Sequence, residues 1–236
     1  MKTIFFNLIF TFGFIAMANE VAHSQDQVSF SNIDRYKVAN MELALLASEE
    51  NRVVLMGDSI TEGWNWTSPD FLKETGYINR GIGGQTTPQM LVRFRVDVID
   101  LQPRIVVILA GTNDLAGNTG YASIASILGN IKSMAEIASH NGIEVILASV
   151  LPAIDYPWKP GLEPAPKIIE LNEKLKTYAQ KNNFIYLDYY SALVDGEGGL
   201  KVPDYTSAND LVHPNKSGYT VMEALLRDSV QGVLGK

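Results

Sequence analysis

The sequence predicts a three-layer α/β/α sandwich built on a parallel sheet of about five strands. Two observations lead to this fold class. Short runs of Val, Ile and Leu alternate along the chain with longer segments whose apolar residues recur at helical spacing. The short runs are continuously apolar, as is typical of parallel strands that helices cover on both faces. The short links between them favour right-handed βαβ units.

Five short apolar segments account for the predicted strands. Of these segments, residues 105–110 form the longest apolar run, and residues 77–79 give the weakest strand signal. Ligands of open parallel sheets bind beyond the carboxyl ends of the strands, so the loops that follow these segments should hold the chemistry. In chain order the predicted strands are residues 52–56, 77–79, 105–110, 143–148 and 184–187.

Five longer segments carry the helical pattern. Within residues 122–139, Ile127, Ile131 and Met134 fall on one face, and Asn141-Gly142 signals a helix end. The segment at 32–49 is expected to pack on the outside of the molecule. The other predicted helices are residues 87–100, 166–181 and 217–230.

Composition excludes several classes of function. The chain has 19 Lys and Arg against 26 Asp and Glu, and this net charge of −7 argues against a nucleic-acid binder. The absence of cysteine excludes disulfides, cysteine nucleophiles, Cys-ligated metals and a cysteine-linked lipid anchor. With 46% hydrophobic residues the chain is able to bury a substantial core, which excludes pervasive disorder.

The first 24 residues have the pattern of a secretory leader. A positive Met1-Lys2 start precedes an apolar run that ends in small residues. Cleavage is expected after Ala18 or after Ser24, and residues 25–236 are expected to form one exported domain, periplasmic or secreted. An uncleaved membrane anchor is the alternative, although the run is short for a spanning helix.

Three predicted strand ends carry polar or glycine-rich blocks. Gly57-Asp58-Ser59-Ile60 places a serine at a strand-to-helix turn, as either a nucleophile or a helix N-cap. The backbone N–H groups of Gly81-Ile82-Gly83-Gly84 suit either an oxyanion site or a plain tight turn. In Gly111-Thr112-Asn113-Asp114, Asn113 is either an amide donor or a turn residue.

The histidines narrow these choices. His23 lies in or beside the leader and His140 lies at a predicted helix end, which leaves His213. Asp210 precedes His213 by three residues, within reach of the imidazole Nδ1. A nucleophile needs a base and the base needs an orienting group, and Ser59, His213 and Asp210 supply the three.

Four sequence blocks resemble those of the SGNH (GDSL-type) hydrolases in order and spacing, over nearly the whole mature chain. They are Gly57-Asp58-Ser59-Ile60, Gly81-Ile82-Gly83-Gly84, Gly111-Thr112-Asn113-Asp114 and Asp210-Leu211-Val212-His213. The resemblance implies a flavodoxin-like sandwich and two-step acyl transfer by a Ser59–His213–Asp210 triad, without metal or organic cofactor. Residues 59–64 are similar to the branch that contains platelet-activating-factor acetylhydrolase-like proteins and bacterial carbohydrate esterases.

The same resemblance implies an oxyanion hole. Its donors are the Ser59 N–H, the Gly84 N–H and the Asn113 amide, which would stabilise the tetrahedral intermediate. Because two glycines stand side by side, Gly83 is the alternative to Gly84.

The substrate is predicted from weaker features. Trp64, Trp158 and Tyr189 follow predicted strands and are candidates for stacking on a sugar ring. The proline-rich segment 152–166 either walls the pocket or only connects. The sequence shows no long apolar lid, which favours small acyl groups such as acetyl on a carbohydrate or a similar small ester.

The sequence leaves one alternative function open and disfavours two others. A lysophospholipase or thioesterase of the same family would share the chemistry and differ in chain-length preference. A catalytically silent carbohydrate-binding protein would share only the scaffold, and the filled catalytic positions disfavour it. A doubly wound nucleotide binder is disfavoured because the chain has neither a Walker nor a Rossmann fingerprint.

Overall fold

The computed structural model describes residues 30–45 and 51–235, so the predicted leader and its cleavage sites lie outside the described residues. Five parallel strands form one sheet in the order β2-β1-β3-β4-β5. The five predicted strands are therefore confirmed, each with bounds within two residues of those expected. They are β1 Val53–Gly57, β2 Ile78–Gly81, β3 Ile105–Leu109, β4 Glu144–Ala148 and β5 Ile185–Leu187.

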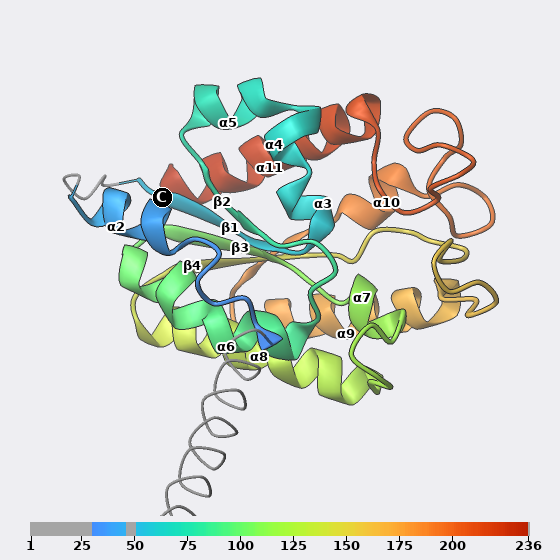
Figure 1. Ribbon diagram of the computed structural model, residues 1–236, viewed down its shortest axis with the longest axis horizontal. Coiled ribbons are helices and arrows are strands. Elements are labelled where there is room, and N and C mark those ends of the chain that lie inside the picture. Colours follow the sequence, from blue (N-terminus) through green and yellow to red (C-terminus); the bar gives the residue numbers. More distant parts are fainter. Residues whose placement is uncertain (1–29, 46–50, 236) are drawn as a thin grey trace, which may run out of the picture.

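Helices cover both faces of this sheet, which confirms the predicted α/β/α sandwich (Figure 1). One face packs against the long helices α6 Thr87–Asp97, α8 Ile124–His140 and α9 Ala165–Lys181. The other face packs against α11 Lys216–Leu234 and the short helices α3 Ser59–Glu62, α4 Trp64–Thr67, α5 Pro69–Thr75 and α10 Tyr189–Leu193. The remaining elements are α2 Lys37–Leu45, the 3-10 helix η1 Ile99–Leu101 and α7 Thr112–Leu115.

The central strand shows why the apolar runs are continuous. Val106 and Ile108 of β3 belong to the core on the α6–α8–α9 side. Ile105, Val107 and Leu109 belong to the core on the α11 side. Full burial of each such side chain contributes about 1.5–3 kcal/mol relative to exposure, so polar residues are excluded from both faces.

The differences from the predicted elements are small. The helix expected at 87–100 ends at Asp97, and η1 follows it after Val98. The helix expected at 32–49 is observed as α2 Lys37–Leu45, and residues 46–50 lie outside the described part of the chain. The helix expected at 217–230 continues to Leu234. Within the described ranges, no helix has the length and the apolar character needed to cross a membrane.

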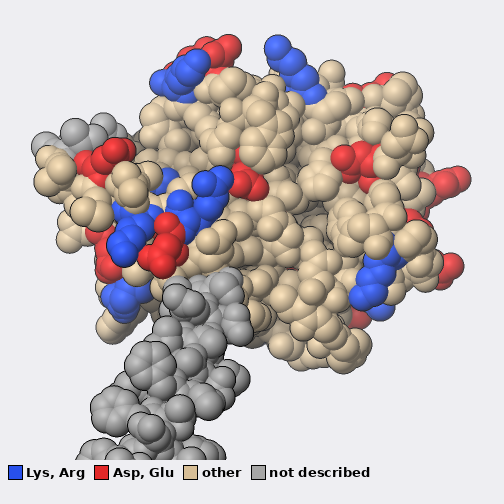
Figure 2. Space-filling model, in the orientation of Figure 1, with Lys and Arg blue, Asp and Glu red and all other residues tan. Residues whose placement is uncertain are grey.

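Charged side chains are mixed on the face that Figure 2 displays. Lys and Arg are interspersed with Asp and Glu there and do not gather into one basic patch. This distribution agrees with the sequence-based argument against nucleic-acid binding.

Candidate active site

The carboxyl ends of neighbouring strands bring the sequence blocks to one edge of the sheet. α3 begins directly after β1 and α7 begins directly after β3, and both helices lie at the same edge (Figure 1). The glycine block follows β2, the strand beside β1. The site is therefore assembled where the topology of an open parallel sheet places its ligands.

Ser59, His213 and Asp210 form one hydrogen-bonded chain. Ser59 Oγ lies 2.8 Å from His213 Nε2. His213 Nδ1 lies 2.8 Å from Asp210 Oδ1, and the backbone N–H of His213 donates to the same oxygen at 2.7 Å. Leu211 between them has φ +63°, a left-handed turn that folds the Asp210 carboxylate back onto the His213 ring. This arrangement fixes one nitrogen of the imidazole on the carboxylate and presents the other to the serine.

Asp58 caps α3, so the side chain of Ser59 is not needed as the cap and can bond to another residue. The backbone N–H of Ile60 donates to Asp58 Oδ1 at 2.9 Å, so Asp58 is the N-cap and Ser59 is the first helical residue. The alternative that Ser59 serves as the cap is therefore wrong. Burial raises the pKa of Asp58 to about 6, against the opposing effects of the hydrogen bond from the Ile60 N–H and of the nearby His213.

The two glycines of the second block differ in their backbone partners. The Gly83 N–H donates to Glu62 Oε2 at 2.8 Å. No described residue accepts a hydrogen bond from the Gly84 N–H. Gly84 has φ +75°, a conformation that glycine adopts without the cost paid by other residues. This difference favours Gly84 over Gly83 as a donor to a bound oxyanion.

Asn113 lies beside both of these segments. Its amide Nδ2 donates to the Gln85 carbonyl at 3.1 Å and to Asp58 Oδ2 at 3.3 Å. Asn118 Nδ2 donates to Asn113 Oδ1 at 2.8 Å and to the Gly84 carbonyl at 3.2 Å. Asn118 thus fixes which end of the Asn113 amide carries the donors. Asn118 lies outside the four sequence blocks, and an exposed Asn is a common loop residue, so the sequence alone does not single it out.

A family comparison covers all four sequence blocks. The model of the GDSL-like lipase/acylhydrolase family matches residues 55–221, which span the Ser59, glycine, Asn113 and His213 blocks. The chain belongs to this family.

Solved structures of similar proteins support the family assignment over nearly the whole fold. A proposed acylhydrolase from Bacteroides fragilis is 51% identical, with a TM-score of 0.83 over 86% of this chain and 98% of that one. A GDSL-like lipase from Bacteroides thetaiotaomicron is 49% identical, with a TM-score of 0.82 and the same coverage.

One curated relative covers a shorter part of the chain. The Bacillus subtilis protein named uncharacterized lipoprotein YqeF is 34% identical over an alignment of 120 residues, and the match covers 44% of this chain and 49% of that protein. The match therefore spans about half the length of that relative.

Two of the three aromatic residues predicted to contact the substrate are buried in the core. Trp64 is 2% exposed and packs against Phe71 and Tyr219 in the α11-side core. Tyr189 is 1% exposed in the same core. Neither ring is accessible at the edge of this GDSL-family site. Both aromatics are core residues, and the prediction that they contact substrate is wrong.

The exposed aromatics that border the triad are Trp158 and Trp66. Trp158 is 45% exposed, its ring centroid lies 6.3 Å from that of His213, and its Nε1 donates to Asn118 Oδ1 at 3.2 Å. The proline-rich segment that carries it therefore walls the site. Trp66 is 64% exposed and lines a cavity of about 400 Å³ that contains Ser59 and His213.

The rest of this cavity is lined by a mixture of polar and apolar residues. Beyond the triad and Trp66, its lining comes from Gly63, Thr67, Ser207, Pro214, Asn215 and Tyr219. No group of three or more potential metal-ligating side chains occurs in the part of the chain that the structure describes.

Proposed function

We propose that the protein is a serine ester hydrolase with Ser59 as nucleophile, His213 as general base and Asp210 as the group that orients the histidine. The observation that carries this proposal is the continuous Ser59–His213–Asp210 chain, with 2.8 Å at each side-chain step. Membership of the acylhydrolase family supports ester hydrolysis as the class of reaction. A metal or organic cofactor has no step in this mechanism.

The proposed first half-reaction forms an acyl-enzyme. His213 Nε2 takes the proton of Ser59 Oγ as the oxygen attacks the ester carbonyl, and Asp210 stabilises the resulting imidazolium. His213 then protonates the leaving alcohol. In the second half-reaction the same His213 activates a water molecule, which releases the acid and regenerates Ser59.

The oxyanion that forms in each step requires preorganised donors. We assign this role to the N–H groups of Ser59 and Gly84 and to the Asn113 amide. Asn113 Nδ2 carries two protons, now directed at Gln85 and Asp58, so one of them must turn toward the oxyanion. Each such donor accounts for about 10²–10³ in turnover in enzymes of this type.

The surroundings of the triad favour a small acyl group on a sugar or a similar polar alcohol. Beside the triad, the cavity is lined by Gly63, by short polar side chains, by Pro214 and Tyr219, and by one exposed tryptophan, Trp66, and none of the described residues that line it has a long aliphatic side chain. Trp158 presents a second exposed ring beside His213, and exposed indoles suit stacking on sugar rings. The proposed substrate is therefore an acetylated carbohydrate. We further propose that the protein is exported, because the first residues have a leader pattern and the Bacillus relative is named a lipoprotein.

A chain-length series tests the proposal. The purified mature protein and its Ser59→Ala variant are assayed on p-nitrophenyl acetate, butyrate and octanoate. The expected result is hydrolysis that is fastest for acetate and that falls at least about 10³-fold in the variant. A preference for octanoate would favour the lysophospholipase or thioesterase alternative. Full activity in the variant would show that the nucleophile is assigned wrongly.

A further inference from the structure

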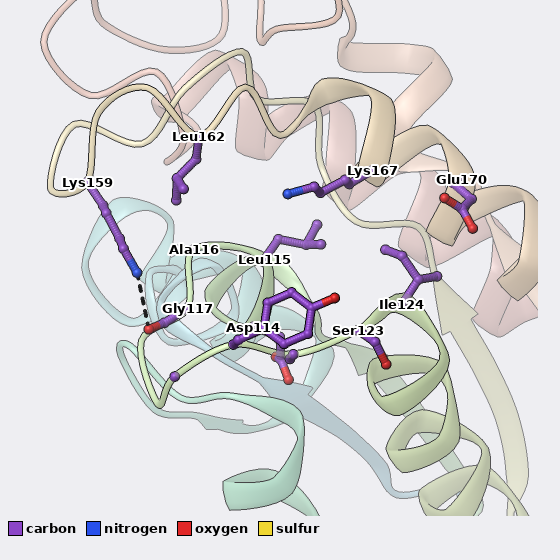
Figure 3. A pocket seen from close by; sticks show the side chains of 13 residues that line it. Asp114, Leu115, Ala116, Gly117, Ser123, Ile124, Lys159, Leu162, Lys167 and Glu170 are labelled. Carbon is purple, nitrogen blue, oxygen red and sulfur yellow. Dashed lines mark hydrogen bonds between the residues drawn. The ribbon is translucent and has the colours of Figure 1, made fainter.

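A second cavity, of about 330 Å³, opens between the loop after α7 and the proline-rich loop (Figure 3). Asn118 and Trp158 are hydrogen-bonded to each other beside the triad. Gly117 and Lys159, the chain neighbours of these two residues, line the cavity. One side consists of the loop from α7 to the start of α8. The other consists of the proline-rich loop and the first turns of α9. The mechanism proposed above uses no residue of this cavity.

Two lysines from different elements supply positive charge to the cavity. Lys159 comes from the proline-rich loop, and its Nζ approaches the Gly117 carbonyl at 3.5 Å. Lys167 comes from α9 and points its ammonium group into the space between Leu115 and Leu162 (Figure 3). Neither lysine forms an ion pair with another residue in the described ranges.

The two acidic residues of the lining are already engaged elsewhere. The Asp114 carboxylate accepts hydrogen bonds from the Thr87 hydroxyl at 2.6 Å and from the Thr87 N–H at 2.9 Å. Glu170 pairs with Lys174 at 3.6 Å, one turn further along α9. The formal charges of the lining balance, but both carboxylates are bonded to residues outside the lining, Thr87 and Lys174, whereas the ammonium groups of Lys159 and Lys167 have no acidic partner among the described residues, so an incoming anion would pair with the lysines.

The remaining surface of the cavity is apolar and suits the face of a sugar ring. Leu115, Leu162 and Ile124 line it, together with Tyr121, whose side chain is 93% exposed. An almost fully exposed tyrosine beside aliphatic side chains provides a stacking platform. Cationic and aromatic groups together match an acidic sugar better than a neutral one.

The loop that carries Lys159 and Leu162 is held in a defined shape. The Asp155 carboxylate accepts from the backbone N–H of Gly161 at 3.0 Å and from that of Leu162 at 3.4 Å. These hydrogen bonds close the loop around Trp158 and Lys159. The orientation of Lys159 toward the cavity and of Trp158 toward His213 is thus set by one local structure.

We propose that this cavity is a subsite for an anionic group, a carboxylate or a sulfate, on a sugar unit next to the one that carries the ester. The proposal rests on the function proposed above and narrows its substrate to acidic acetylated glycans. Such a chain would cross the Trp158 ring, with its ester at Ser59 and its anion between Lys159 and Lys167.

Binding calorimetry tests the subsite without relying on turnover. The ligands are three tetrasaccharides of equal length: one neutral, one with a single glucuronic acid and one with a single sulfate. The proteins are the wild type, the Lys159→Gln/Lys167→Gln double variant and Lys181→Gln. The last carries a charge change on the same helix, about 21 Å further along its axis than Lys167.

The wild type should bind at least one anionic ligand about fivefold to tenfold more tightly than the neutral one, as two partly exposed ion pairs permit. The double variant should lose this preference, and Lys181→Gln should keep it. Preference for the uronate or for the sulfate identifies the anion. Equal binding of all three ligands by the wild type, or a preference that survives in the double variant, would overturn the subsite.

Hydrolysis of p-nitrophenyl acetate separates this result from the proposed function. The ester is neutral and too small to reach both lysines, so the double variant should hydrolyse it at the wild-type rate. If the wild type does not hydrolyse p-nitrophenyl acetate, the esterase proposal is refuted. If the wild type hydrolyses p-nitrophenyl acetate but binds the anionic and neutral tetrasaccharides equally, only the subsite proposal is refuted.

Discussion

Asp58, the residue before the proposed nucleophile, is a buried carboxyl whose charge works against folding. It is 1% exposed and has a pKa raised to about 6 by burial. Between about pH 4 and pH 6 the folded protein therefore binds more protons at this site than the unfolded chain does. By linkage, the contribution of Asp58 to stability falls as the pH rises through this window, by about 2 kcal/mol out of about 3 kcal/mol for the complete titration.

Replacing Asp58 with asparagine tests this pH dependence. Asp58→Asn keeps an oxygen to cap α3 and removes the titration. The free energy of unfolding of the variant minus that of the wild type should rise by about 2 kcal/mol from pH 4 to pH 6.5. Urea unfolding of both proteins across this range measures the difference. The lost Asn113 contact shifts the variant by a constant, so a difference that does not vary with pH would contradict the prediction.

Asn118 is expected to act through Asn113 as a positioning residue. Asn118→Ala removes the donor to Asn113 Oδ1, which allows the Asn113 amide to rotate away from the oxyanion. We expect kcat for p-nitrophenyl acetate to fall about tenfold with little change in KM, less than the 10²–10³ expected for loss of a donor itself.

The control for this prediction is Asn182→Ala, which removes an exposed side chain at the end of α9 and should leave kcat unchanged. A rise in KM at constant kcat for Asn118→Ala would mean that Asn118 contacts the substrate and does not orient the Asn113 amide.

At the residue scale, motif residues were predictable and their supporting residues were not. The blocks around Ser59 and His213 stand out because several reactive residue types recur at strand ends in one order. Trp64 and Trp66 could not be told apart, because a one-turn helix has no periodicity to show which ring faces the core. Asn118 acts through side-chain contacts that form only once the loops have folded.

At the element scale, α6 holds together the ends of β1 and the glycine block. Arg93 of α6 is fully buried and donates to the Gly57 carbonyl at 3.0 Å and to Gln85 Oε1 at 2.6 Å. Its other side forms an ion pair of 2.9 Å with the equally buried Asp97. One helix side chain thus joins the segment before Ser59 to the segment after Gly84.

Removing one partner of this pair should be far more harmful than removing both. Arg93→Met leaves the Asp97 charge buried without its counter-ion, and we expect a loss of about 3–5 kcal/mol in the free energy of unfolding. The double variant Arg93→Met/Asp97→Leu should recover much of that loss. Chemical denaturation of the three proteins measures both effects, and an equally destabilised double variant would contradict this account of the pair.

Long elements were predictable from periodicity and short ones were not. α8 and α9 each run for 17 residues, which is enough for an apolar face to repeat several times. α3, α4 and α7 have four residues each and no repeat. Asp58 caps α3, whereas α4 and α7 have no side-chain cap and are held by buried side chains such as Trp64 and Leu115.

At the scale of the whole molecule, the order of strands explains why the site residues meet. β1 lies between β2 and β3, so the loops that carry Ser59, Gly84 and Asn113 emerge side by side. His213 arrives from the loop before α11, which packs on the face above β1. The fold class follows from the alternation of strands and helices, whereas the walls of the site depend on loop conformations that no periodicity encodes.

Labelling with a fluorophosphonate probe tests the central claim most directly. The probe reacts only with a serine that an adjacent base activates, and intact-mass analysis with peptide mapping shows which serine carries it. The wild type should acquire one label, on Ser59, and the Ser59→Ala and His213→Ala variants should acquire almost none. Absence of label on the folded wild type, or a label on another serine, would contradict the proposed triad.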